Sequence, residues 1–151
     1  MTRTRQRPAT DPGLQARRLA MLALFEEDFR PDQGLIALDR LAAEKGVRRE
    51  TADQARDLVA GVLRHRPELD AEIARLAPAI PVSELGRVER TILRSALFEV
   101  LYSAAIPDGE AIHDAVSLAR TYAGDAARRL VNGVLGSVAR STGSGASGRG
   151  A

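Results

Sequence analysis

Apolar residues recur along the chain at helical spacing, and no segment alternates apolar and polar residues as a half-buried strand would. In RRLVNGVLGSVAR (128–140), for example, the aliphatic residues share one helical face. The pattern predicts seven helices. Five of them lie at about 14–29, 32–44, 84–104, 110–122 and 128–140. Of the other two, the third helix opens with the capping pair Thr51 and Gln54, and the fourth begins at Pro67 and ends at Pro78. Short connections between successive helices are typical of antiparallel neighbours in a bundle, so the expected fold class is all-α.

The dipeptide Asn132-Gly133 lies inside the last predicted helix, although between two strands it would indicate a hairpin turn. Periodicity favours the helix, and Asn132, Gly133 and Gly136 then gather on its second face, with an arginine at each end. A glycine inside a helix costs about 1 kcal/mol relative to alanine. Three interpretations stay open: a close contact with a neighbouring helix, plain tolerance of the glycines, or a flat cationic strip that another molecule's backbone approaches.

The two ends of the chain differ from its body in composition and charge. Residues 1–13 are predicted to be a flexible basic arm, and residues 141–151 a disordered Gly/Ser tail, which leaves one helical domain over 14–140. The net charge of the 151 residues is +2, but residues 1–18 and residues 128–151 each carry +4. The body between them is therefore acidic. This segregation favours a polyanion as the partner near the ends and a different partner on the body.

Several function classes lack their sequence features. The chain has no cysteine, which fits a reducing, cytoplasmic environment and excludes thiolate chemistry. Its longest apolar run, at 19–25, is too short to span a bilayer, and the N-terminus has no secretory signal. No Walker A, GxGxxG or GxSxG motif is present, and His65 and His113 have no ligand partners at metal-binding spacing. We therefore expect neither an enzyme nor a metal or cofactor site.

Binding features are more prominent than catalytic ones. Arg87, Arg90 and Arg94 form a stripe along one predicted helix, which is either a solvated, salt-bridged face or a basic binding surface. Phe25 lies in a helix that is apolar on most faces, so it is either a core residue or a partly exposed anchor for a partner protein.

Five segments in order resemble the NusB family of transcription antitermination factors. They are ARRLAMLALFEED (16–28), LVAGVL (58–63), ELGRVERTILRSALFEVLY (84–102), the segment 106–140 as a whole and, within it, the specific VNGVL (131–135). The resemblance covers about 14–140. It implies an all-α fold of about seven helices in two small packed bundles.

The resemblance also implies a function. Members of this family bind boxA-type single-stranded RNA in nascent transcripts, notably of ribosomal RNA operons. They do so as a heterodimer with the ribosomal small-subunit protein NusE, in a complex with NusA, NusG and RNA polymerase, without catalysis or a cofactor. The family includes monomers and homodimers, so a homodimer is left open here.

The matching positions give the expected site residues. The resemblance assigns RNA binding to Arg3, Arg5, Arg7, Arg17, Arg18, Tyr122, Arg128 and Arg129. It assigns partner binding to Phe25, Glu89 and Arg94. The chain departs from the family in the insert PATDPGLQ after the first arginines and in His113, which replaces a more usual asparagine.

Two other functions remain as alternatives at this point. One is a stand-alone RNA-binding module related to those of ribosomal RNA methyltransferases, although nothing in the chain resembles a methyl-donor site. The other is a protein–protein scaffold whose basic ends have no RNA role.

Overall fold

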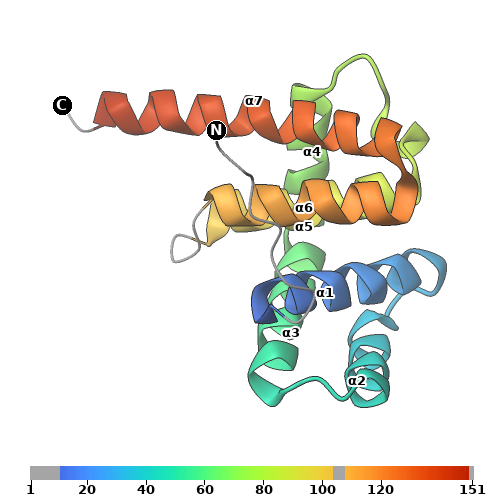
Figure 1. The fold of residues 1–151 in the computed structure, drawn as a ribbon. Helices are drawn as coiled ribbons and strands as arrows, with labels where there is room; N and C mark the ends of the chain where they lie inside the picture. Colours follow the sequence, from blue (N-terminus) through green and yellow to red (C-terminus); the bar gives the residue numbers. More distant parts are fainter. Residues whose placement is uncertain (1–10, 104–107, 150–151) are drawn as a thin grey trace.

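The computed structural model describes the backbone of residues 11–103 and 108–149, and within those ranges it contains helices but no strand (Figure 1). The α-helices are α1 (Pro12–Phe29), α2 (Gly34–Lys45), α3 (Arg49–Arg64), α4 (Arg66–Leu76), α5 (Arg87–Tyr102), α6 (Asp108–Ala123) and α7 (Asp125–Arg149). A short 3-10 helix, η1 (Val82–Glu84), precedes α5. The prediction of an all-α fold with seven helices is confirmed.

The helices form two bundles that share one core. In Figure 1, α1 to α3 make the lower bundle and α4 to α7 the upper one, and α1 and α3 both contact α5 across the boundary. Aliphatic side chains from both bundles fill one continuous cluster, and its largest fully buried members include Leu19, Leu38, Leu69, Ile73, Leu93, Leu97 and Leu135. Because α1 packs against α2, α3, α5 and α6, most of its faces are apolar, as the sequence indicates.

The first helix begins two residues before its predicted start. The Asp11 carboxylate accepts hydrogen bonds from the backbone N–H groups of Gly13 and Leu14, at 3.0 and 3.2 Å, and Pro12 occupies the first helical turn. An aspartate cap followed by proline is a strong helix start. The predicted boundary between arm and domain at residue 13 is therefore too late, since α1 already includes Pro12 and Gly13.

Two other predicted helix starts are wrong. Helix α3 begins at Arg49, so Thr51 lies in its first turn and does not cap it, and Arg48 at the N-cap makes no side-chain capping bond. Gly46, in the left-handed conformation at φ 61°, ends α2, and the chain resumes as helix almost at once. Helix α5 begins at Arg87, because Ser83 belongs to the 3-10 turn η1.

A close approach of two helices explains one glycine. The ring of Phe98 on α5 lies directly against Gly61 on α3, in the space that a Cβ atom at position 61 would occupy. Glycine is required here because of the contact, since a larger residue would force the two bundles apart.

The last helix differs most from the sequence-based prediction. Its backbone is helical as far as Arg149, whereas the Gly/Ser composition of residues 141–151 predicts a disordered tail. A helix already nucleated by packed residues gains one hydrogen bond for each residue added, which lets it continue into a polar segment. Side chains are described in α7 only as far as Val138, and residues 150–151 lie outside the described residues.

Candidate RNA and partner interfaces

The first of the expected RNA-binding arginines in α1 is buried. Arg17 is 5% exposed, and its guanidinium donates to both oxygens of Glu99 at 3.0 Å. The same group donates to Asp114 at 2.7 Å and to Glu110 at 3.2 Å. Burial alone would lower the pKa of Arg17, but hydrogen bonds and attraction to these carboxylates outweigh it and raise the pKa. The expectation that Arg17 binds RNA is corrected: it joins α1 to α5 and α6.

The expected partner-binding residue Arg94 is also buried. Its guanidinium donates to both oxygens of Asp70, at 2.7 and 2.9 Å, and lies 3.7 Å from Asp28. Asp28 also accepts from Arg90 at 2.6 Å and from Arg66 at 2.9 Å. Burial would raise the pKa of Asp28, but the Arg90 hydrogen bond and the three positive charges lower it. Two of the three arginines in the stripe therefore stabilise the fold, and Arg94 is not a partner contact.

Three of the expected RNA-binding residues lie together at the turn between α6 and α7. Tyr122 is exposed at the end of α6, while Arg128 and Arg129 lie in the first turns of α7. Both arginines donate to Asp125, at 2.7 and 3.0 Å, and the hydrogen bond from Arg128 lowers the pKa of Asp125. Exposed ion pairs of this kind are weak. A phosphate can therefore replace Asp125 as a partner of either arginine.

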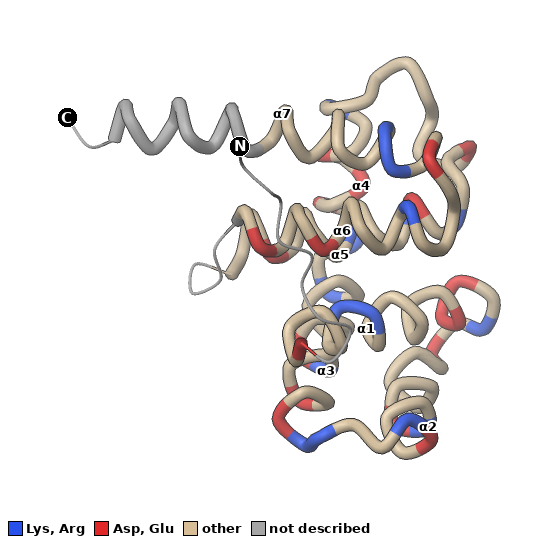
Figure 2. The backbone as a smooth tube through the Cα atoms, viewed as in Figure 1, with Lys and Arg blue, Asp and Glu red and all other residues tan. Residues whose placement is uncertain are grey.

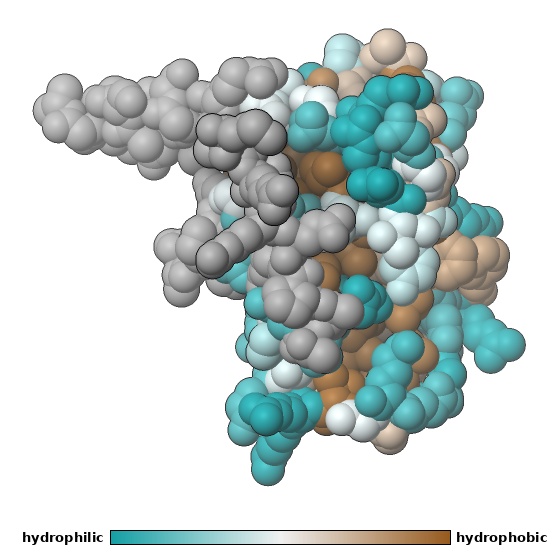
Figure 3. Space-filling view, viewed as in Figure 1, coloured by the Kyte–Doolittle hydropathy of each residue, from teal (hydrophilic) through white to brown (hydrophobic). Residues whose placement is uncertain are grey.

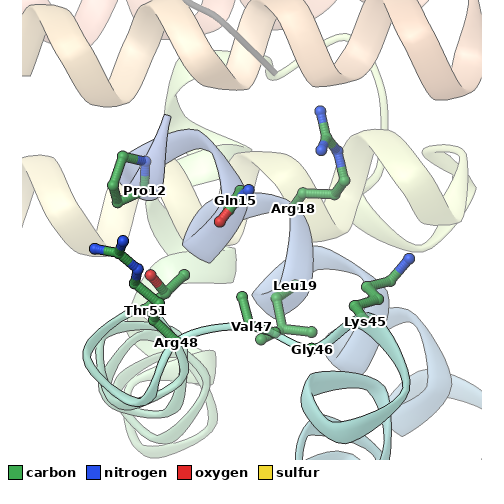
Figure 4. Close-up of a pocket in the computed structure, with 9 residues that line it drawn as sticks. All are labelled: Pro12, Gln15, Arg18, Leu19, Lys45, Gly46, Val47, Arg48 and Thr51. Atoms are coloured by element: carbon green, nitrogen blue, oxygen red, sulfur yellow. The ribbon is translucent and has the colours of Figure 1, made fainter. Parts of the chain in front are cut away.

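Arg18 lines a hollow between α1 and the turn that joins α2 to α3 (Figure 4). The hollow has a volume of about 540 Å³ and is lined by Pro12, Gln15, Arg18, Leu19, Lys45, Gly46, Val47, Arg48 and Thr51. Its lining includes three cations and no carboxylate among the described residues. The sequence pattern does not reveal this site, because Lys45 and Arg48 are far from Arg18 along the chain and match no motif.

The C-terminal end of α1 forms an apolar surface with α2. Phe25 is half-buried and packs edge-on against Phe29, with ring centroids 5.1 Å apart. Phe29 is 57% exposed and Ile36 on α2 is 61% exposed, and both line an open groove of about 570 Å³ with Phe25. Exposed large apolar residues gathered in one groove are typical of a protein-binding surface. The half-burial of Phe25 is compatible with both sequence interpretations, a core residue and an anchor for a partner, whereas Phe29 and Ile36 are identified only by the structure.

The start of α5 lies beside this groove. The Arg87 guanidinium carbon is 4.0 Å from the centroid of the Phe29 ring, a cation–π contact that joins α5 to α1. Glu89 is half-buried in the first turn of α5 and folds its carboxylate back against Gly86 at the N-cap. The fold thus brings Phe25 and Glu89 to the same end of α1, whereas Arg94 points into the Asp28 cluster.

The Asn132-Gly133 face of α7 is open. Both residues are exposed, and a Cβ atom at Gly133 would meet no described atom within 4 Å. The interpretation that a neighbouring helix presses against Gly133 is therefore wrong. The other two interpretations, plain tolerance of the glycines and a flat strip beside Arg129, both fit an open face, and the strip stays a prediction.

Charged and apolar side chains are distributed differently over the lower bundle. Figure 2 shows acidic and basic residues interspersed along α1, α2 and α3, and Figure 3 shows hydrophobic side chains along the middle of the same face, bordered by hydrophilic ones. No helix in the described part of the chain combines the length and apolarity needed to cross a membrane. The expected RNA-binding residues Arg3, Arg5 and Arg7 lie outside the described residues.

Comparison with known proteins agrees with the resemblance. The NusB family signature matches residues 14–140. A transcription antitermination protein NusB from Symbiobacterium thermophilum is 40% identical over 134 residues, covering 83% of this chain and 88% of that protein. One from Dehalococcoides mccartyi is 34% identical over 126 residues, with the same shares covered. A crystal structure of NusB and NusE in complex with dsRNA aligns with a TM-score of 0.79 at 28% identity, over 87% of this chain and 98% of that one.

This chain belongs to the NusB family, and its fold is that of solved NusB structures. The apolar groove on α1 and the basic turn at the start of α7 lie on separate parts of the surface of this fold.

Proposed function

We propose that this protein is a cytoplasmic, non-catalytic transcription antitermination factor that binds boxA-type single-stranded RNA in nascent ribosomal RNA transcripts as a heterodimer with NusE. The heterodimer then joins NusA, NusG and RNA polymerase. The observation that carries the proposal is the presence of two chemically distinct exposed surfaces on one NusB-family fold, one cationic with an aromatic residue and one apolar. A homodimer, which the family also includes, would hide the RNA-binding surface.

The cationic surface fits single-stranded RNA. Among the described residues, Arg128 and Arg129 pair with the exposed Asp125 alone, so they can bind phosphates and release counterions, which supplies most of the affinity. Tyr122 offers an exposed ring on which an unstacked base can stack. Arg18 and the three N-terminal arginines would add further phosphate contacts. The described surface has few aromatic residues, so we expect modest affinity until a partner adds contacts.

The apolar groove fits NusE. Phe29 and Ile36 expose large side chains that a partner would remove from water, and Phe25 lines the same groove. We expect Glu89, in the first turn of α5, to contact the partner as well. The body of the chain is acidic, which complements a basic ribosomal protein. A solved complex of NusB with NusE and dsRNA supports the assignment of both partners.

The RNA part is tested by fluorescence anisotropy with a labelled boxA-like RNA and a scrambled control, with and without NusE. We expect tighter binding to the boxA-like RNA, strengthened by NusE, and a linear fall of log affinity with log salt, with a slope of about 0.7 for each phosphate bound. Arg129→Gln should weaken binding, whereas Arg64→Gln, at an exposed arginine far along α3, should not. Equal weak binding to both RNAs, unaffected by NusE, would refute the proposal.

The partner part is tested by titrating NusE with Phe29→Ala. Because an aromatic anchor at an interface contributes more than about 1 kcal/mol, we expect roughly tenfold weaker binding. Leu101→Ala, at another exposed apolar residue on α5, is the matched control. Equal affinity for the two variants would show that NusE binds elsewhere.

A further inference from the structure

We infer that the hollow between α1 and the α2–α3 turn is a second phosphate-binding site, which holds the backbone of the RNA away from the α6–α7 turn. The inference rests on the proposed RNA-binding function and adds to it a site built from Lys45, Arg48 and Thr51 together with Arg18. It depends on three properties of the hollow: its uncompensated charge, an unpaired hydroxyl group and an uncapped helix end.

The charge in the hollow is not neutralised by the protein. Arg18 reaches it from α1, Lys45 from the end of α2 and Arg48 from the residue before α3 (Figure 4). Within the described residues, none of these cations forms an ion pair. Most other arginines in α1 to α5 do pair, including Arg17, Arg40, Arg56, Arg66, Arg90 and Arg94. Three cations from separate elements line this one hollow without an acid, with their charged ends on different sides of it in Figure 4, and such a lining favours an anion.

Thr51 supplies a polar group that the protein leaves unused. Its side chain is 3% exposed, points into the hollow toward α1, and makes no hydrogen bond to any described residue. The Thr51 hydroxyl oxygen is not among the fully buried unpaired atoms of the described residues, so a ligand in the hollow can reach it. A phosphate oxygen in the hollow would accept a hydrogen bond from this hydroxyl group.

The N-terminus of α3 ends at the same place. Arg48 at the N-cap makes no side-chain capping bond, so the N–H groups of the first turn are not satisfied by a cap. The partial positive charge of a helix N-terminus favours an anion. The α3 terminus, the Thr51 hydroxyl group and the three cations therefore border the same hollow.

The size and lining of the hollow favour a nucleotide segment over a small ion alone. A volume of about 540 Å³ is far larger than a phosphate group requires. Leu19 and Val47 form an apolar part of the wall, against which a ribose can pack. The lining has no aromatic ring among the described residues, so the site would bind the backbone without reading the base.

The test measures RNA binding by three variants at several salt concentrations. Lys45→Gln/Arg48→Gln should bind about tenfold more weakly and lower the salt slope by about 0.7 for each phosphate that is no longer neutralised. Thr51→Val keeps the shape and the charge, so we expect a loss of roughly tenfold or more, the effect of a hydrogen bond to a charged group, with an unchanged slope. Arg64→Gln is the control for removal of an exposed cation.

A second readout locates the anion directly. Titration of the intact protein with inorganic phosphate, followed by amide chemical shifts, should move the signals of residues 48–51 in the wild type and move them less in Thr51→Val. Absence of such shifts would overturn the site. Shifts without any loss of RNA affinity in the variants would show a site for free phosphate and overturn its RNA role.

The outcomes separate this inference from the proposed function. If the wild type binds RNA with a steep salt dependence and the hollow variants behave like Arg64→Gln, only the hollow is wrong. If the wild type does not bind RNA at all, the proposed function fails first.

Discussion

Replacing Arg17 tests whether burial or RNA contact explains this arginine. In Arg17→Gln, the carboxylates of Glu99 and Asp114, both nearly inaccessible to solvent, lose their cation. Removing one partner from a buried ion pair costs about 3–5 kcal/mol, because the remaining charge is uncompensated. That is a large part of the roughly 5–15 kcal/mol that stabilises a domain. For a chain of this length, it corresponds to a fall in melting temperature of about 10 °C.

The assay is urea unfolding followed by circular dichroism, with Arg18→Gln as the control. Arg18 is the next residue on the same helix and has no ion-pair partner within the described residues, so its replacement should change the free energy of unfolding by less than about 0.5 kcal/mol. Arg17→Gln/Glu99→Gln should recover part of the lost stability, because it removes one of the unpaired charges. An Arg17→Gln protein as stable as the wild type, with weaker RNA binding, would refute the assignment of Arg17 to the fold.

Three further predictions concern stability. The pKa of Asp28 is lowered in the folded protein, so its ion pairs stabilise the fold fully at pH values above the ordinary aspartate pKa of 3.8. This contribution is lost as pH falls through the folded-state pKa. The difference in unfolding free energy between the wild type and Asp28→Asn should therefore shrink below pH 3.8. Gly61→Ala should destabilise the protein by about 1–3 kcal/mol in urea unfolding, because the added methyl group overlaps Phe98, and a neutral result would contradict the close packing. Gly133→Ala, on an open helical face, should instead stabilise it by up to about 1 kcal/mol, and a simultaneous loss of RNA affinity would show that RNA approaches this strip.

The helices could be predicted from the sequence because apolar residues recur in each at helical spacing, as a stripe on one face or, in α1, on most faces. The predicted helix starts are wrong where the local sequence is compatible with more than one start. Thr51 followed by Gln54 looks like a capping box. In the structure, the left-handed Gly46 ends α2 and α3 begins at Arg49, two residues before Thr51, which therefore lies inside the first turn of α3. Ser83 likewise lies in a 3-10 turn that no periodicity reveals.

The candidate site was harder to predict than the fold, because the role of an arginine depends on residues far along the chain. Arg17 and Arg18 are adjacent and chemically identical, yet only Arg17 meets carboxylates, which lie 82 and 97 positions away. The same holds for Arg94, whose partner Asp70 is on another helix. By contrast, Phe25, Tyr122 and Arg129 have exposed or half-buried side chains, and their roles remain predictions that the proposed binding experiments address.

Helix α1 is surrounded by four other helices, which has a mechanical consequence. Its 18 residues span about 27 Å, with the cationic hollow near one end and the apolar groove at the other. Because α1 is packed on several sides, it fixes the distance between the ligands that bind near its two ends. Cooperation between NusE and RNA would then come from contacts that the two ligands make with each other across that fixed span, without a change of shape in the protein between them.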